Sequence, residues 1–226
     1  MKNQSSKKFL TVVLCALCFA LAVCGLLNVP QAHAYRATTT AKGAVLEAGS
    51  RRVLFSHNPD AKMPMASCTK IMTALVAIES GELDKTVEVR PEACGVEGSS
   101  VYLRPKEKLT LKELLYGLML QSGNDCAEAI AYELAGGVEN FADMMNSRAK
   151  ELGANNTNFV TPNGLHDDNH YTTAYDLGLI ACQALSNDTF REIVGTKSVK
   201  ISNEGFDYPR VITNKNKLLG RRRRRS

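Results

Sequence analysis

Alternating apolar and polar positions near the start of the chain predict a β-hairpin. Residues 44–47 and 52–55 are β-prone and flank the turn-forming pair Gly49-Ser50. A longer apolar stretch extends from Ser67 to Glu79, and Gly81 closes it. Because this stretch is apolar on most sides of a helix, it predicts a buried, central helix.

More helices are predicted in the middle of the chain. Thr110 and Glu113 are spaced as a capping box, which begins a helix that runs to about residue 120. Further helices are predicted at residues 125–134, 138–152 and 171–185, and short β-prone segments at 86–89, 198–201 and 208–212. We therefore expect an α/β (α+β) fold, in which an antiparallel sheet is interrupted by a large helical insertion.

Residues 1–34 have the pattern of an export signal. A basic start precedes an apolar run over residues 9–27, and Pro30 and Ala32-His33-Ala34 then predict cleavage after Ala34. The run is also long enough to span a bilayer, so membrane association through an uncleaved signal is the alternative. In both cases we expect an exported protein that is extracytoplasmic, either in the cell envelope or secreted. The catalytic domain is expected over residues 35–220.

The net charge of +5 comes from the two ends of the chain. Arg221 to Arg225 supply five positive charges, and three lysines of the signal supply three more. Without those eight, 20 basic residues stand against 23 acidic residues. Since the folded part carries no basic excess, we expect no nucleic-acid partner. Residues 221–226 form a low-complexity, Arg-rich tail, which we expect to be disordered or artefactual.

Four cysteines follow the signal, namely Cys68, Cys94, Cys126 and Cys182. Their density is too low for a disulfide-stapled scaffold, and no C-x-x-C pattern occurs among them, so their pairing stays open. Cys68 and Cys126 are expected to be small, buried packing residues. The segment from His166 to His170 carries metal-type ligands but is predicted to be a loop. We expect no metal site and no cofactor.

Ser67 and Lys70 are candidate catalytic residues, because positions i and i+3 share one face of a helix. Burial disfavours the ammonium form, so Lys70 can take a proton from Ser67. The nearby helix N-terminus favours negative charge on an attacked carbonyl. The same S-x-x-K pattern occurs at Ser5/Lys8 and Ser147/Lys150, but only Ser67 begins an apolar helix.

A second candidate element, Ser122-Gly123-Asn124, lies between two predicted helices. A loop in this position can bring a hydroxyl and an amide into a cleft. Ser122 can relay a proton to a leaving amine, and Asn124 can orient Lys70 or bind a substrate amide. An ordinary interhelical turn is the alternative for this segment alone.

The order of these two elements is that of the penicillin-interacting serine enzymes. The chain resembles the D-alanyl-D-alanine carboxypeptidases of serine peptidase family S11, the low-molecular-weight penicillin-binding proteins. The resemblance covers residues 36–220, and the stretches that carry it include 65–73, 120–127, 158–166 and 170–177. It implies the penicillin-binding-protein/β-lactamase-like transpeptidase fold.

The resemblance also implies a reaction and its residues. Ser67 is the nucleophile, Lys70 the proton acceptor and Ser122 the proton relay, while Asn124 supports Lys70 and the substrate. The implied substrate is a peptidoglycan pentapeptide that ends in D-Ala-D-Ala, and β-lactams acylate the same serine. The implied role is in cell-wall biogenesis.

The sequence departs from the family in one respect. The family's third element, K-T-G, occurs nowhere in it, and the chain turns to arginines after Gly220. Loss of one oxyanion donor alone costs ~10²–10³ in rate. We expect a fold that is incomplete at the C-terminus, inactive and poorly stable, with exposed strand edges and apolar faces. The alternatives are a non-catalytic remnant or a module that binds peptidoglycan or penicillin. A β-lactamase is disfavoured, because no E-x-x-L-N pattern is present.

Overall fold

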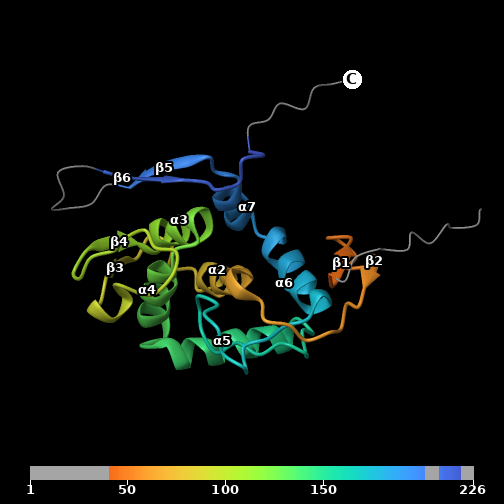
Figure 1. The fold of residues 1–226 in the computed structure, drawn as a ribbon. Coiled ribbons are helices and arrows are strands. Elements are labelled where there is room, and N and C mark those ends of the chain that lie inside the picture. The colour runs from red at the N-terminus through yellow and green to blue at the C-terminus, as the bar shows by residue number, and fades with distance from the viewer. Residues whose placement is uncertain (1–40, 202–208, 220–226) are drawn as a thin grey trace, which may run out of the picture. The chain divides into compact units, whose positions relative to one another are not determined.

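The computed structural model describes residues 41–201 and 209–219. The predicted signal and the Arg-rich tail lie outside these described residues. The elements follow one another in the order β1 (Gly43–Leu46), β2 (Val53–His57), η1 (Ala66–Thr69), α2 (Lys70–Glu79), β3 (Thr86–Glu88), η2 (Pro91–Ala93), β4 (Lys108–Thr110), α3 (Leu111–Gln121), α4 (Asn124–Ala135), α5 (Val138–Glu151), α6 (Ala174–Ser186), α7 (Asp188–Gly195), β5 (Ser198–Ile201) and β6 (Arg210–Thr213) (Figure 1).

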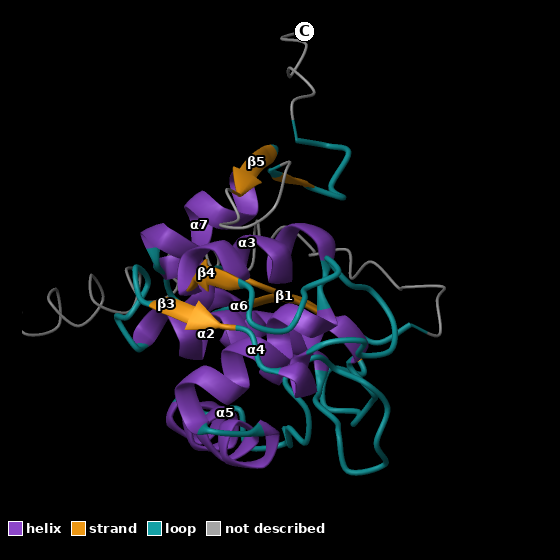
Figure 2. Ribbon diagram, turned by 90° about the vertical axis from the view of Figure 1, so that its left-hand side faces the viewer, coloured by secondary structure: helices purple, strands orange, loops and turns teal. Residues whose placement is uncertain are grey.

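The mixed α/β class predicted from the sequence is confirmed, with strands at both ends of the described part and helices between them. The described strands form three separate antiparallel pairs, β1–β2, β3–β4 and β5–β6, instead of one continuous sheet. Figures 1 and 2 show these pairs at the periphery, where β1 packs against α6 and β6 packs against α3. Each pair therefore relies on a helix for the burial that a wider sheet would provide.

The β1–β2 pair keeps much of its apolar surface in contact with solvent. Val45, Val53, Leu54 and Phe55 are between 38% and 54% exposed. Val211 of β6 is 55% exposed. The prediction of exposed apolar strand residues is thus confirmed for these two pairs, and such surfaces promote association between chains.

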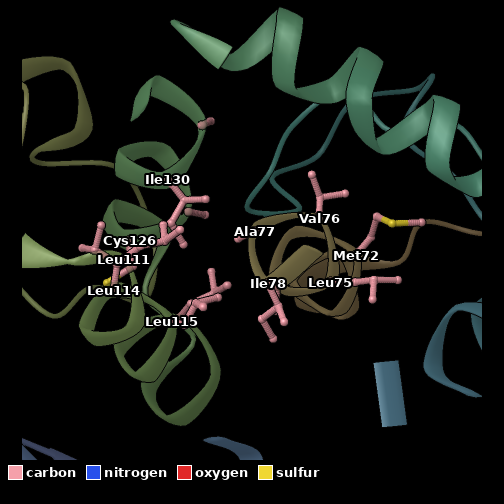
Figure 3. Close-up of a cluster of buried hydrophobic side chains, with 14 of the residues drawn as sticks. Met72, Leu75, Val76, Ala77, Ile78, Leu111, Leu114, Leu115, Cys126 and Ile130 are labelled. Carbon is pink, nitrogen blue, oxygen red and sulfur yellow. The ribbon is translucent and has the colours of Figure 1, made fainter. Parts of the chain in front are cut away.

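Helix α2 forms the centre of the hydrophobic core, as its apolar sequence predicted. Met72, Ala74, Leu75 and Ala77 are at most 1% exposed. The helix contacts α3, α4, α5, α6 and α7. In Figure 3, Ala77 and Ile78 point from α2 toward the side chains of α3 and α4. Burial of each large aliphatic side chain stabilises the fold by about 1.5–3 kcal/mol, so the core holds the start of α2 firmly in place.

Local side-chain hydrogen bonds define the helix starts. The predicted capping box is present, since Thr110 accepts from the N–H of Glu113 and the Glu113 carboxylate accepts from the N–H of Thr110. Thr173 caps α6 by accepting from the N–H of Asp176. Asn187 caps α7 in the same way. Within the described residues, no helix is both long and apolar enough to cross a membrane.

Candidate active site

Ser67 lies in a short 3-10 turn, η1, that leads directly into α2. The sequence predicted an α-helix from Ser67 onward, whereas the regular α-helix begins at Lys70. Ala66, just before the serine, has a φ of +45°, which is uncommon for a residue with a side chain. Ser67 is exposed, while Thr69 and Lys70 are buried. The turn therefore presents the hydroxyl to solvent and directs the amine inward.

The amine of Lys70 connects three parts of the chain. Its Nζ lies 3.3 Å from the Oγ of Ser67, 2.7 Å from the Oδ1 of Asn124 and 2.7 Å from the carbonyl oxygen of Asn163. Lys70 as a whole is only 2% exposed. The structure thus brings together Ser67, Lys70 and Asn124, which the sequence singled out as candidates.

Burial lowers the pKa of Lys70 from 10.5 to about 8, and the nearby charge of Lys215 lowers it as well. A neutral amine has two hydrogens and one lone pair. The two shortest contacts, to Asn124 and Asn163, are with oxygen acceptors and take up both hydrogens. The lone pair is then left for the hydroxyl of Ser67, so that Lys70 can act as its general base.

Asn124 begins α4 and is itself held in place from two sides. Its N–H donates to the carbonyl of Ser99, and its Nδ2 donates to the carbonyl of Glu97. A Cβ on Gly98 would lie 2.8 Å from Nδ2, so a side chain larger than hydrogen at that position would displace the amide. The amide therefore presents its oxygen to Lys70 in a fixed orientation.

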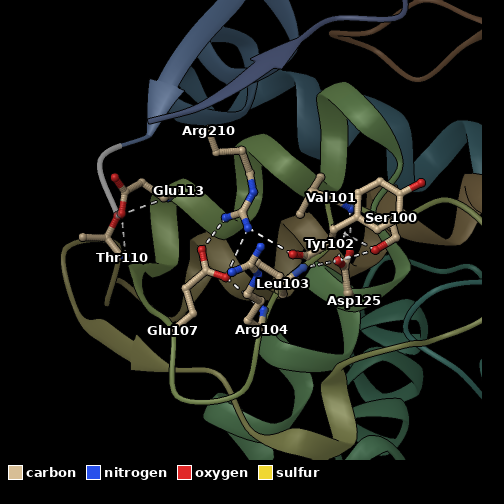
Figure 4. A network of polar contacts seen from close by, with 10 residues as sticks. All are labelled: Ser100, Val101, Tyr102, Leu103, Arg104, Glu107, Thr110, Glu113, Asp125 and Arg210. Carbon is tan, nitrogen blue, oxygen red and sulfur yellow. Dashed lines mark hydrogen bonds and ion pairs between the residues drawn. The ribbon is translucent and has the colours of Figure 1, made fainter. Parts of the chain in front are cut away.

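The neighbouring Asp125 organises the loop that holds Asn124. Its carboxylate accepts hydrogen bonds from the hydroxyl of Ser100 and from the N–H groups of Val101 and Leu103 (Figure 4). It is fully buried, and its partners satisfy a charge that would otherwise be costly to bury. Asp125 is thus a structural support of the site.

Asn163 is a site residue that the sequence did not reveal. Its contribution is a backbone carbonyl, which leaves no mark in the type of side chain. Its side chain fixes the loop locally, because Nδ2 donates to Glu128 and Oδ1 accepts from the N–H of Leu165. The hydroxyl of Thr73, one turn after Lys70, donates to the carbonyl of Pro162. The loop is therefore attached to α2 at two successive turns.

Ser122 ends α3 in the left-handed conformation, with a φ of +61°. Its hydroxyl forms no hydrogen bond with any residue that the structure describes, so its predicted role as a proton relay stays a prediction. Lys215 lies beside this turn and donates to the carbonyl of Gln121 at 2.6 Å. The sequence analysis assigns no site role to Lys215, although its positive charge acts on Lys70.

The C-terminal strand β6 is attached to the same region. Arg210 forms an ion pair with Glu107, whose side chain is 1% exposed, and donates to the carbonyl of Tyr102 (Figure 4). The side-chain amide of Gln121 donates to the carbonyl of Thr213. These contacts place the segment that carries Lys215 next to the turn that carries Ser122.

The other candidate groups lie outside this arrangement. Ser147 and Lys150, the second S-x-x-K pair of the described part, are exposed on α5. The four described cysteines are free thiols, and the prediction that Cys68 is buried is wrong, because it lies on the exposed turn beside Ser67. Cys126 is buried, as predicted. Over residues 41–201 and 209–219, no group of three or more His, Cys, Asp or Glu is placed to hold a metal ion.

Sequence comparisons identify the family to which the chain is similar. The D-alanyl-D-alanine carboxypeptidase family matches residues 30–225. The chain is 37% identical over 185 residues to the D-alanyl-D-alanine carboxypeptidase DacF of Bacillus subtilis, which covers 79% of this chain and 47% of DacF. It is 35% identical over 186 residues to DacC of Escherichia coli, covering 77% and 45%. The chain thus spans about half the length of these curated relatives.

Solved structures share the fold. A D-alanyl-D-alanine carboxypeptidase from Mycobacterium tuberculosis matches with a TM-score of 0.75 and 32% identity, covering 80% of this chain and 68% of that one. A variant of a Streptomyces DD-transpeptidase matches with the same TM-score and identity, covering 82% and 78%. The predicted fold class is therefore confirmed by comparison as well as by the described elements.

Proposed function

We propose, from the premise that the chain belongs to the D-alanyl-D-alanine carboxypeptidase family, that Ser67 is the nucleophile of a serine D-Ala-D-Ala carboxypeptidase. The observation that carries the proposal is the contact of Ser67 with a buried lysine amine whose other two partners are oxygen acceptors. This geometry supplies a nucleophile and, in the neutral form of Lys70, a base without a histidine.

The proposed reaction has two steps. Lys70 takes the proton of Ser67, and the serine oxygen attacks the carbonyl carbon of the peptide bond between the last two D-alanines of a peptidoglycan stem peptide. The C–N bond breaks as the proton held by Lys70 passes through Ser122 to the leaving nitrogen, so the terminal D-alanine departs and Lys70 is neutral again. Water then attacks the acyl-enzyme with Lys70 as the base, which releases the shortened peptide and restores Ser67. β-Lactams acylate Ser67 in the same way.

The location of the substrate supports export. Peptidoglycan lies outside the cytoplasmic membrane, so the proposed function requires that the protein cross that membrane. Residues 1–34 have the required signal pattern. We propose that the protein acts in the cell envelope, on cell-wall peptides.

The 226 residues contain no Lys-Thr-Gly sequence, which in the family supplies a carboxylate-binding lysine and one side of the oxyanion hole. Loss of one oxyanion donor costs ~10²–10³ in rate. We therefore expect acylation of Ser67 to be at least about 10²-fold slower than in a relative measured alongside, such as the B. subtilis DacF protein. A polypeptide of these 226 residues alone is expected to be inactive on the time scale of that relative.

The test is the mass of the intact protein during incubation with benzylpenicillin, followed over hours. We expect a slowly formed adduct that peptide mapping places on Ser67. The Ser67→Ala variant should form none. The Ser147→Ala variant, which changes the exposed S-x-x-K pair, should react like the unmodified chain. Release of D-alanine from an acetylated peptide that ends in D-Ala-D-Ala is measured on the same samples.

Two outcomes would change this proposal. A folded sample that binds benzylpenicillin in a calorimeter, but forms no adduct, would identify a non-catalytic binding module. Stoichiometric labelling within minutes would show that the chain needs no further oxyanion donor, and would overturn the expectation of inactivity.

A further inference from the structure

A buried histidine lies behind the nucleophile turn and is not explained by the reaction above. His170 is 3% exposed, and its Nε2 lies 2.7 Å from the Oγ1 of Thr69. Thr69 is fully buried and is the residue between the Ser67-Cys68 pair and Lys70. On its other side, the Nδ1 of His170 accepts from the N–H of Val160 at 3.0 Å and is 3.4 Å from the N of Thr161.

These contacts determine the protonation state of the ring. Because Nδ1 faces backbone N–H donors, it must carry its lone pair, and the ring hydrogen must be on Nε2. Nε2–H then donates to Thr69, whose own hydroxyl hydrogen donates to the carbonyl of Ala66 at 2.8 Å. A continuous chain of hydrogen bonds, with one direction throughout, runs from the backbone of Val160 to the residue before the nucleophile.

The series of hydrogen bonds joins the segment that carries the nucleophile to the segment that carries an acceptor of the base. At one end, Ala66 has its unusual positive φ, and its carbonyl orientation sets where Ser67 points. At the other end, residues 160–164 carry the carbonyl of Asn163, which accepts from Lys70. Gly164 packs so closely that a Cβ would lie 2.0 Å from the carbonyl oxygen of Ala66. The nucleophile turn and the loop are therefore in direct contact as well.

We propose that His170, acting through Thr69, is a positioning residue that aligns the hydroxyl of Ser67 with the amine of Lys70. This inference rests on the proposed function and deepens it, because it concerns the same site. His170 touches neither the substrate nor the reacting atoms. It fixes the distance between the turn that carries the nucleophile and the loop that carries an acceptor of the base.

The proposal has a consequence at acidic pH. A second proton on His170 would place a donor on Nδ1 against the N–H of Val160, which would break the chain of hydrogen bonds. Burial lowers the pKa of His170, while Asp167 raises it. The charged or titratable neighbours that share a pocket with the ring are Lys62, His166, Asp167, Asp168 and Tyr171. The neutral ring is thus the form in which the alignment holds.

The first measurement reads the ring itself and needs no activity. Nitrogen NMR of the chain with labelled histidine distinguishes a protonated from an unprotonated Nδ1, and the His170→Gln variant identifies the signal by its loss. We expect Nδ1 without a proton and Nε2 with one at pH 6.5. A protonated Nδ1 at that pH would overturn the proposal, whether or not the chain reacts with penicillin.

The second measurement compares two buried threonines. Thr69→Val removes the hydroxyl that links His170 to Ala66, and Thr69→Ser keeps it. Thr172→Val is the matched control, because Thr172 is buried on the same segment as His170 and its hydroxyl contacts Thr157 instead. Both Val variants should lower Tm by similar amounts. Per folded molecule, however, only Thr69→Val should slow acylation of Ser67, by about 10²-fold as expected for a misplaced reacting group, and Thr69→Ser should restore the rate.

The outcomes separate this inference from the function on which it rests. If the unmodified chain forms no adduct on Ser67, the proposed function fails, and the NMR result alone decides the placement of the histidine proton. If the unmodified chain reacts but Thr69→Val and Thr172→Val slow acylation equally, the threonine has only a structural role and the positioning proposal is wrong.

Discussion

The buried amine of Lys70 should make the stability of the protein depend on pH. Its pKa is about 8 in the folded chain and 10.5 when the side chain is in water. Between these values the unfolded chain binds more protons than the folded chain, so the free energy of unfolding rises with pH. From pH 7 to pH 9.5, the Lys70 contribution should increase the free energy of unfolding by about 2 kcal/mol. Below pH 8 the destabilisation becomes nearly constant at about 3 kcal/mol.

Urea unfolding followed by circular dichroism, at steps between pH 7 and pH 9.5, measures this effect. The comparison is with Lys70→Met, whose unbranched apolar side chain carries no titratable group. Subtracting one pH profile from the other removes the contributions of the other ionisable groups to the free energy of unfolding. Loss of the donor to Asn124 and Asn163 adds an offset to the variant, but that offset does not change with pH.

The control is Lys150→Met, which removes an exposed lysine on α5. Its profile should run parallel to that of the unmodified chain. If the Lys70→Met profile is parallel as well, Lys70 does not titrate near pH 8 in the folded chain. The argument that it is a neutral base would then fail, even if the variant cannot be acylated.

Two further predictions concern a close packing contact and a buried ion pair near the site. Gly164→Ala should abolish acylation and lower the free energy of unfolding by more than about 2 kcal/mol, because the new Cβ meets a backbone carbonyl at 2.0 Å. The control is Gly136→Ala, which has a similar positive φ but open space around it and should cost only about 1 kcal/mol in the same urea titration. Arg210→Met should lower the free energy of unfolding by about 3 kcal/mol, because it removes a cationic partner of the buried Glu107. The matched change at the half-exposed Arg191 should cost under about 1 kcal/mol, and equal losses would contradict the role of burial.

The long periodic elements could be predicted from the sequence because burial selects residue types along their whole length. The apolar run of α2 and the capping box at Thr110 are examples, and both are present. The sequence does not predict some of the short elements, among them α7 and β4. Helix α7 has eight residues, and β4 has three and exists only through its pairing with β3, which is distant in the sequence. Neither is long enough to show a pattern.

Some residues of the candidate site could be predicted from the sequence and others could not. Ser67, Lys70 and Asn124 could be named because their side chains perform the proposed chemistry. Asn163 could not, since it contributes a carbonyl that every residue possesses. For His170 the sequence predicts only a loop, and nothing in the polar segment around it reveals that this one ring is buried. Such residues become visible only when the chain is folded.

The three contacts of the Lys70 amine also set when the site can exist during synthesis. Asn124 follows Lys70 by 54 residues, and Asn163 follows it by 93. At a translation rate of 5–20 residues per second, the last partner of the amine is made about 5–20 s after the lysine itself. Until then the amine remains hydrated and keeps its ordinary pKa of 10.5, because nothing has removed it from water. The nascent chain therefore carries an ordinary serine at position 67, and the reactive one appears only with the tertiary fold.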